Sequence, residues 1–137
     1  FERYVDHDLK VGNIRILFRE MGLKDWTPER VLKEVRHQKG RVPDGIVSVR
    51  DFLVVIEFEN VLKAKSRYKE FFDTYGRNAD YFFVIVIVFE GIKEWLLEMD
   101  YNPAQVWFVE YDKLIDRREK ALLENKHESF EFERLLK

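Results

Sequence analysis

The feature that most constrains the fold is a run of apolar residues, YFFVIVIVF, at positions 81–89. A strand with one face in water alternates apolar and polar side chains, whereas a strand covered on both faces is apolar throughout. The run is too short to cross a membrane as a helix, which needs about 20 apolar residues. It therefore predicts an interior strand in a sheet that has helices packed on both faces.

The segments on either side of this run alternate between helical and extended patterns. The expected elements are a helix at 8–21, a polar loop at 37–40, a hairpin at 41–60, helices at 61–75 and 92–99, a strand at 105–111 and a helix at 112–123. Residues 27–36 fit a helix begun by Thr27-Pro28 about as well as a short strand, and 127–137 fit either a short helix or an extended segment. This order predicts an α/β fold with a mixed central sheet flanked by helices.

Composition limits the class of protein and its partners. The 137 residues suffice for a single domain with a buried core, and the absence of cysteine excludes thiolate metal sites and fits the cytoplasm. A formal charge of −2 argues against a surface coated in basic residues but allows a local basic patch. With no signal peptide visible, we expect no membrane partner. Because the first residue is Phe1 rather than methionine, we expect 1–137 to be the C-terminal part of a longer protein.

Three acids gather at one end of the hairpin expected at 41–60. Asp44 opens the first strand, while Glu57 and Glu59 close the second strand on one face, because side chains alternate along a strand. A tight turn at Arg50-Asp51 would bring Asp44 to the end that carries both glutamates. Three carboxylates at the edge of an apolar hairpin repel one another unless a cation or a shared proton offsets their charge. This cost makes the cluster a candidate site.

Carboxylates in this arrangement are typical ligands of Mg²⁺ or Mn²⁺, which prefer oxygen. Such an ion can activate water and stabilise charge on a phosphoryl oxygen. The helix expected next carries Lys63 and Arg67 on its solvent face, with Lys65 and Lys69 at the flanks. Cations beside a metal site suit the phosphate backbone of a nucleic acid. The residues therefore indicate metal-dependent phosphodiester hydrolysis.

Simpler interpretations stand beside this one. The acids also fit a solvated hairpin end, and the basic helix face also fits an ordinary charged surface. The three histidines are dispersed without paired spacing, which argues against zinc, and neither a nucleophile elbow nor a glycine-rich phosphate loop is present. Two carboxylates would suit a glycosidase, but a domain of this size offers no obvious sugar cleft.

Several short motifs occur together in the chain: Arg41-Val42-Pro43-Asp44-Gly45, Ile56-Glu57-Phe58-Glu59, Lys65-Ser66-Arg67-Tyr68 and Tyr75. They resemble the PD-(D/E)XK nuclease-like superfamily, and most closely the nuclease-like domains in replication-relaxation and mobilisation proteins of mobile elements. His7-Asp8-Leu9, and Trp26 with Glu29, also resemble the opening pattern of that group. The resemblance spans roughly residues 7–110.

The resemblance implies a restriction-endonuclease-like core that binds Mg²⁺ or Mn²⁺. Asp44 and Glu57 would be metal ligands, and Glu29 would be the additional acid that many members supply from an upstream element. The chain departs from the pattern at Glu59, where the superfamily usually has lysine, although some restriction endonucleases carry glutamate there. Lys63 or Lys65 would then supply the missing cation. The implied catalytic residues are Asp44, Glu57, Glu59, Lys63 and Lys65, and the implied nucleic-acid contacts are Lys63, Lys65, Arg67 and Lys69.

The function implied by the resemblance is a metal-dependent DNA endonuclease in mobile-element replication, mobilisation or defence, with a homodimer as the form that cuts two strands. One alternative keeps the fold without catalysis, as a DNA-binding or dimerisation module of a helix-turn-helix regulator. A second alternative is an ordinary interaction domain, whose three carboxylates would lie far apart or face bulk water.

Overall fold

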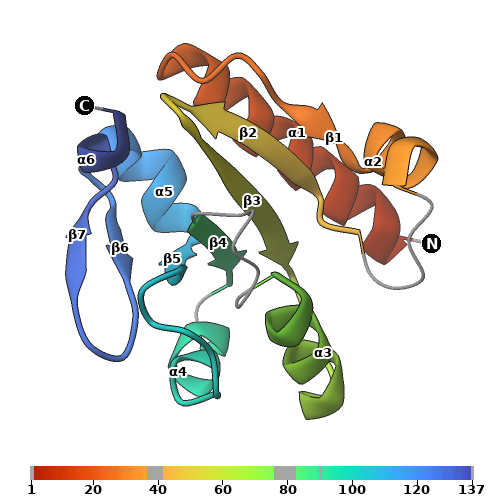
Figure 1. The fold of residues 1–137 in the computed structure, drawn as a ribbon, viewed down its shortest axis with the longest axis vertical. Helices are drawn as coiled ribbons and strands as arrows, with labels where there is room; N and C mark the ends of the chain where they lie inside the picture. The colour runs from red at the N-terminus through yellow and green to blue at the C-terminus, as the bar shows by residue number, and fades with distance from the viewer. Residues whose placement is uncertain (1, 37–41, 76–82, 90, 137) are drawn as a thin grey trace.

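The computed structural model describes residues 2–36, 42–75, 83–89 and 91–136. Within these residues the chain forms a seven-stranded mixed sheet with helices on both faces (Figure 1). The helices are α1 (Glu2–Glu20), α2 (Glu29–Arg36), α3 (Lys65–Tyr75), α4 (Ile92–Leu97), α5 (Tyr111–Arg117) and α6 (Glu133–Leu136), with a 3₁₀ turn η1 (Arg118–Lys120). The strands are β1 (Thr27–Pro28), β2 (Gly45–Val49), β3 (Phe52–Glu59), β4 (Phe83–Val88), β5 (Val106–Glu110), β6 (Leu122–Glu124) and β7 (Ser129–Glu131). The predicted α/β class is confirmed.

The expected hairpin is formed by β2 and β3. Val49 pairs with Phe52, so that Arg50 and Asp51 alone make the turn, as the sequence predicted. Arg50 has a φ of 54°, the positive value that the commonest two-residue hairpin turns need at their first position. β1 pairs antiparallel with β2 on the other side of the hairpin. The strands lie in the sheet in chain order from β1 to β7.

The centre of the sheet is parallel. β3 pairs with β4 and β4 with β5, both in parallel, through the crossover helices α3 and α4. Glu59 lies beside Val88, and Val88 beside Glu110, so the carboxyl ends of the three strands share one edge of the sheet. Side chains at these strand ends, among them Glu59 and Glu110, are thereby brought to the same edge of the sheet.

β4 explains the apolar run that first suggested a covered strand. Val84, Val86 and Val88 pack in the cluster under α3 and α4, while Ile85 and Ile87 pack in the cluster under α1. The first cluster is rich in aromatic side chains, and its members from α3 are Tyr68, Phe71, Phe72 and Tyr75. The second receives Ile14, Leu17 and Phe18 from α1, Leu114 from α5 and Leu135 from α6. Both faces of the central strand are therefore covered, as predicted.

A buried lysine joins the second half of the sheet. The amino group of Lys93, at the start of α4, lies 3.1 Å from Glu110 Oε1 and also contacts the carboxylate of Glu124. Glu110 ends β5 and Glu124 ends β6. Burial lowers the pKa of Lys93, but the two carboxylates outweigh it and the pKa is raised. The ammonium group thus stays charged and ties α4 to two strands.

The chain differs from the sequence-based expectation in three places. The helix expected at 112–123 exists as α5, but its predicted end was wrong. Arg118 adopts a φ of 55° and ends the helix, so that Leu123 lies in β6 and in the core. The helix expected from 61 begins at Lys65, and α1 begins at Glu2 rather than at residue 8. The 127–137 segment supplies both forms that were considered, a strand (β7) and a short helix (α6). The loop expected at 37–40 and residues 41, 81 and 82 lie outside the described residues.

Within the described ranges, the helices lack the combination of length and apolar character that crossing a membrane requires.

Gly45, the first residue of β2, is required by packing. A β-carbon at this position would lie 2.3–2.6 Å from atoms of the Trp26 indole, whereas a β-carbon at Gly12 in α1 would meet no atom within 4 Å. Trp26 is itself buried and contacts Phe18 edge-to-face, with ring centroids 5.6 Å apart. The indole therefore has little room to yield, and Gly45 allows it to lie against the strand.

We expect Gly45→Ala to lower the free energy of unfolding by about 1–3 kcal/mol, since overpacking a well-filled core costs this much. The matched substitution Gly12→Ala should raise it by about 0.5–1 kcal/mol, because alanine is the better helix former and its methyl group meets nothing. Urea unfolding of both variants measures the difference. Equal stability of Gly45→Ala and the wild type would contradict the packing argument.

Candidate functional site

The hairpin brings two of the predicted acids together. Gly45 pairs with Ile56, so Asp44, one residue before β2, stands opposite Glu57 on β3. Glu59 follows two residues later at the end of the strand. The exposed fractions of Asp44, Glu57 and Glu59 are 6%, 3% and 2%, so all three acids are buried. The interpretation as solvated carboxylates that face bulk water therefore does not describe them.

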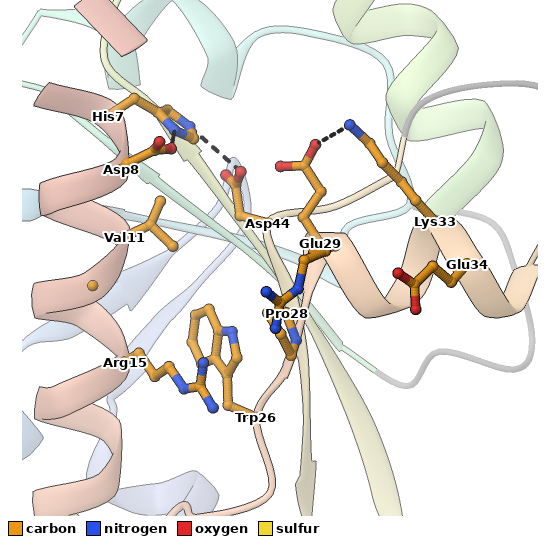
Figure 2. A pocket seen from close by; sticks show the side chains of 12 residues that line it. His7, Asp8, Val11, Arg15, Trp26, Pro28, Glu29, Lys33, Glu34 and Asp44 are labelled. Carbon is orange, nitrogen blue, oxygen red and sulfur yellow. Dashed lines mark ion pairs between the residues drawn. The ribbon is translucent and has the colours of Figure 1, made fainter. Parts of the chain in front are cut away.

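The Asp44 carboxylate is held by β3 and by α1. The backbone N–H of Phe58 donates to Asp44 Oδ2 at 2.7 Å, and Nε2 of His7 lies 3.4 Å from Asp44 Oδ1 (Figure 2). The imidazole of His7 also stands against the ring of Phe58, with centroids 5.5 Å apart. The carboxylate thus receives a backbone donor from β3 and a cationic donor from the helix.

The electrostatics of this group favour an ionised Asp44. Burial raises the pKa of Asp44, but hydrogen bonds with His7 and Glu57, the charge of His7 and the Phe58 N–H lower it, and the net pKa lies below its ordinary value. A hydrogen bond between two carboxyl groups needs one proton. The bond with Glu57 is one of the contacts that favour the ionised form of Asp44. Two carboxyl groups with one proton between them are one way to meet the electrostatic cost foreseen from the sequence.

His7 supplies the positive charge. Its hydrogen bond with Asp44 is the largest influence and outweighs burial, and the pKa of His7 rises from 6.5 to about 9. Asp8 adds a smaller contribution in the same direction, with Oδ1 at 3.5 Å from Nδ1 of the imidazole. At neutral pH the side chain is therefore an imidazolium.

Glu59 has a different set of partners. The amino group of Lys63 lies 2.8 Å from Glu59 Oε2, and the hydroxyl group of Tyr68 donates to the same oxygen at 3.4 Å. That hydroxyl group also accepts the backbone N–H of Lys63 at 3.0 Å. Lys63 was expected on the solvent face of a helix, but it lies in the connection before α3, with its amino group at the carboxyl end of β3.

The other predicted basic residues lie on α3. Lys65, Arg67 and Lys69 are exposed, and Lys69 forms a surface ion pair with Asp73 at 3.3 Å. They are therefore accessible to a large anionic ligand, but they do not enter the carboxylate cluster in the conformation described.

Glu29, expected as an additional metal ligand, begins α2. Its Oε1 atom lies 2.8 Å from the amino group of Lys33, one helical turn away. Glu29 and Asp44 line the same pocket between α1 and α2, as Figure 2 shows. The structure thus places Glu29 near the site and gives its carboxylate a partner on its own helix.

The donor set bears on whether Mg²⁺ or Mn²⁺ could be held. In residues 2–36, 42–75, 83–89 and 91–136, no three acidic or histidine side chains converge closely enough to enclose a metal ion. The hydrogen-bonded pair of Asp44 and Glu57 nevertheless offers two carboxyl groups, and Mg²⁺ is commonly held by one or two carboxylates together with waters and substrate phosphates. The pair fits such an open site, provided that the ion replaces the shared proton.

Two residues of the candidate site were missed at the sequence level. His7 was counted only as an isolated histidine within a motif, although its spacing to Val11, Ile14 and Phe18 is that of the buried face of a helix and would have placed it over the sheet. Tyr68 was named only as the last residue of a motif, without a role in the site. Its buried ring carries a hydroxyl group that needs a polar partner, which points to the acid at the end of the preceding strand.

The ion pair of His7 and Asp44 predicts how stability depends on pH. Because the pKa of His7 is higher in the folded chain than in the unfolded chain, its contribution is complete below about pH 6.5 and is lost as the pH rises through 9. We expect the metal-free wild type to lose about 1–3 kcal/mol of unfolding free energy over this interval relative to His7→Gln. Urea unfolding in EDTA from pH 6 to 9.5 measures it. His127→Gln, an exposed control, should keep the wild-type profile, and identical profiles for His7→Gln and the wild type would refute the coupling.

No protein-family model, no curated protein and no solved structure matches the chain. The carboxylate site and its surroundings are therefore the features that bear on function.

Proposed function

We propose that the chain is a metal-dependent DNA endonuclease-like domain of the PD-(D/E)XK kind, which hydrolyses phosphodiester bonds in mobile-element replication, mobilisation or defence. The observation that carries the proposal is the buried carboxyl pair of Asp44 and Glu57 on adjacent strands, with the amino group of Lys63 held beside Glu59 at the end of the same strand. These groups lie at the sheet edge where the parallel strands end.

The energetic cost of this arrangement supports a functional role. Burying carboxyl groups is unfavourable unless charge and hydrogen bonds compensate for lost hydration, and apolar residues of similar size would often be as stable or more so. A fold gains little stability from three acids at one end of an apolar hairpin. Buried acids with perturbed pKa values instead cluster at sites that bind ions or transfer protons.

Asp44 and Glu57 would hold Mg²⁺ or Mn²⁺. When bound, such an ion lowers the pKa of a bound water and stabilises negative charge on a phosphoryl oxygen. Asp44 is suited to this role because the Phe58 N–H and the His7 imidazolium keep it ionised and fixed in position. His7 would keep the carboxylate aligned when the shared proton of the pair is lost.

Lys63 would take the place of the lysine that the motif lacks at position 59. Glu59 and Tyr68 fix its amino group and its backbone, respectively. A positioned ammonium group can orient the attacking water or stabilise charge on the phosphate as it reacts. Lys65, Arg67 and Lys69, exposed on α3 immediately beyond, would bind the phosphates of the DNA strand. Two copies of the domain would then be needed to cut both strands.

A second candidate is a catalytically inactive DNA-binding or dimerisation module of a helix-turn-helix regulator. The specific observation in its favour is that two of the acids already have cations of the chain beside them, His7 for Asp44 and Lys63 for Glu59. Such pairs could serve structure alone. DNA binding by this module would weaken as salt rises and would not depend on Asp44 or Glu57.

Asp44→Asn and Glu57→Gln test the catalytic proposal. Each should lower the rate of Mg²⁺- or Mn²⁺-dependent nicking of plasmid DNA at least about 100-fold, because each removes a ligand of the ion. Glu70→Gln, an exposed acid on α3, is the control and should cut at the wild-type rate. In calorimetric titration, Asp44→Asn and Glu57→Gln should bind Mn²⁺ more weakly than the wild type, and Glu70→Gln should bind it equally well. Wild-type protein that binds DNA but leaves it intact with every divalent metal would reject catalysis in favour of the second candidate.

Lys63→Met should lower the nicking rate by about 100-fold while Mn²⁺ binding changes little, since the ammonium group acts on the reaction and not on the ion. Lys113→Met is the matched control, because Lys113 also pairs with the last glutamate of a parallel strand, at 3.6 Å from Glu110. The double variant Glu59→Gln/Lys63→Met guards against unfolding, because it removes both charges of the pair and so leaves neither of them without its partner. If this double variant cut DNA at the wild-type rate, the role of Lys63 would be refuted.

A further inference from the structure

A pocket of about 620 Å³ opens between α1 and α2, within the size range of about 300–1,000 Å³ typical of small-ligand sites (Figure 2). His7 and Asp44 line one part of it, and Trp26 and Pro28 line another. Glu57, Glu59 and Lys63 do not line it, so the pocket is separate from the proposed reaction centre and meets it at Asp44.

Two arginines in the wall of the pocket are available to a ligand. Arg15 projects from α1 and Arg30 from α2, and both side chains are exposed. Within the part of the chain that the structure describes, neither forms an ion pair, whereas His7 is engaged by Asp44 and Lys33 by Glu29. Guanidinium groups from two helices that line one pocket are suited to a phosphate, which each can bind through two parallel hydrogen bonds.

An aromatic side chain forms part of the wall of the same pocket. Trp26 lines it beside Pro28 with 7% of its surface exposed, and Gly45 and Phe18 fix the indole from the side of the core. A fixed aromatic ring next to arginines suits a nucleotide, because bases of every kind can pack on aromatic side chains.

Gly12 indicates that the space is kept open. It lies in the middle of the 19-residue helix α1 and lines the pocket, yet a β-carbon there would meet no atom within 4 Å. Glycine weakens a helix relative to alanine. Neither packing nor a turn requires glycine at this position. The physical effect of Gly12 is that no side chain narrows the pocket there.

We infer that this pocket binds one unpaired or terminal nucleotide of a DNA strand, with its phosphate between Arg15 and Arg30 and its base against Trp26. The identity of the ligand rests on the proposed nuclease function. Because the pocket meets Asp44 at one side, a nucleotide held here would fix the position of the strand relative to the carboxyl pair. The pocket would therefore select strands with a free end or an unpaired base over continuous duplex.

Binding of deoxyadenosine 5′-monophosphate, measured by calorimetry in EDTA, tests the inference. We expect Arg15→Ala and Arg30→Ala each to weaken binding about tenfold or more, the loss typical of one charge-assisted hydrogen bond. Arg19→Ala, an exposed arginine one turn further along α1, is the matched control and should bind as the wild type does. Gly12→Leu should also weaken binding at least tenfold without lowering the melting temperature, because leucine narrows the pocket and favours the helix.

Further probes distinguish the contribution of the base from that of the phosphate, and binding of a DNA strand from binding of a free nucleotide. Inorganic phosphate and deoxyadenosine should each bind more weakly than the nucleotide, and a 5′-phosphorylated single strand should bind at least as tightly as the nucleotide. Equal affinity of Arg15→Ala, Arg30→Ala and Arg19→Ala, or no nucleotide binding at all, would overturn the inference. Because the assay contains no metal and involves no cleavage, that result would leave the nuclease proposal standing. A protein that binds the nucleotide but does not cut DNA would instead contradict the nuclease proposal and leave the pocket inference standing.

Discussion

The buried charge of Asp44 is the interaction on which the site depends. Its carboxylate joins three elements that are distant in sequence: α1 through His7, β3 through the Phe58 N–H, and β2, which begins at the next residue. An ionised carboxylate in this position is tolerable only because each neighbour supplies a donor or a charge. Removing any one of these donors or charges would leave the buried carboxylate of Asp44 less well compensated. The local fold and the candidate chemistry therefore depend on the same contacts.

The parallel centre of the sheet gives this group its surroundings. β3, β4 and β5 end along one edge, and each of the outer two ends in a glutamate that meets a lysine. At Glu110 the lysine is Lys93, which also contacts Glu124 and holds strands together. At Glu59 the lysine is Lys63, which comes from the connection to α3 and binds no second strand in the contacts described. The same kind of pair thus serves a structural purpose at one strand and leaves room for chemistry at the other.

Local patterns were sufficient to predict much of the fold. The apolar run at 81–89 identified an interior strand, and the pair Arg50-Asp51 located the hairpin turn, because both signals lie within a few residues. The end of α5 was missed because Leu114, Ile115 and Leu122 suit a helical face as well as the actual turn into β6, and only the core decides between them. His7 was missed as a partner of Asp44 because the rest of α1, β1 and α2 separate the two residues along the chain. The metal, the substrate and the activity remain predictions.

The edges of the sheet have a consequence for assembly. β1 at one edge has two residues and β7 at the other has three, and Glu131 of β7 lies 3.7 Å from Lys120. Short strands with charged side chains are poor templates for a further strand, which protects a mixed sheet against joining to another copy edge to edge. The pairing of two copies that the proposed function calls for would therefore use surfaces other than the sheet edges, and the exposed side chains Leu9 and Ile16 on α1 are apolar groups of the kind that protein contacts bury.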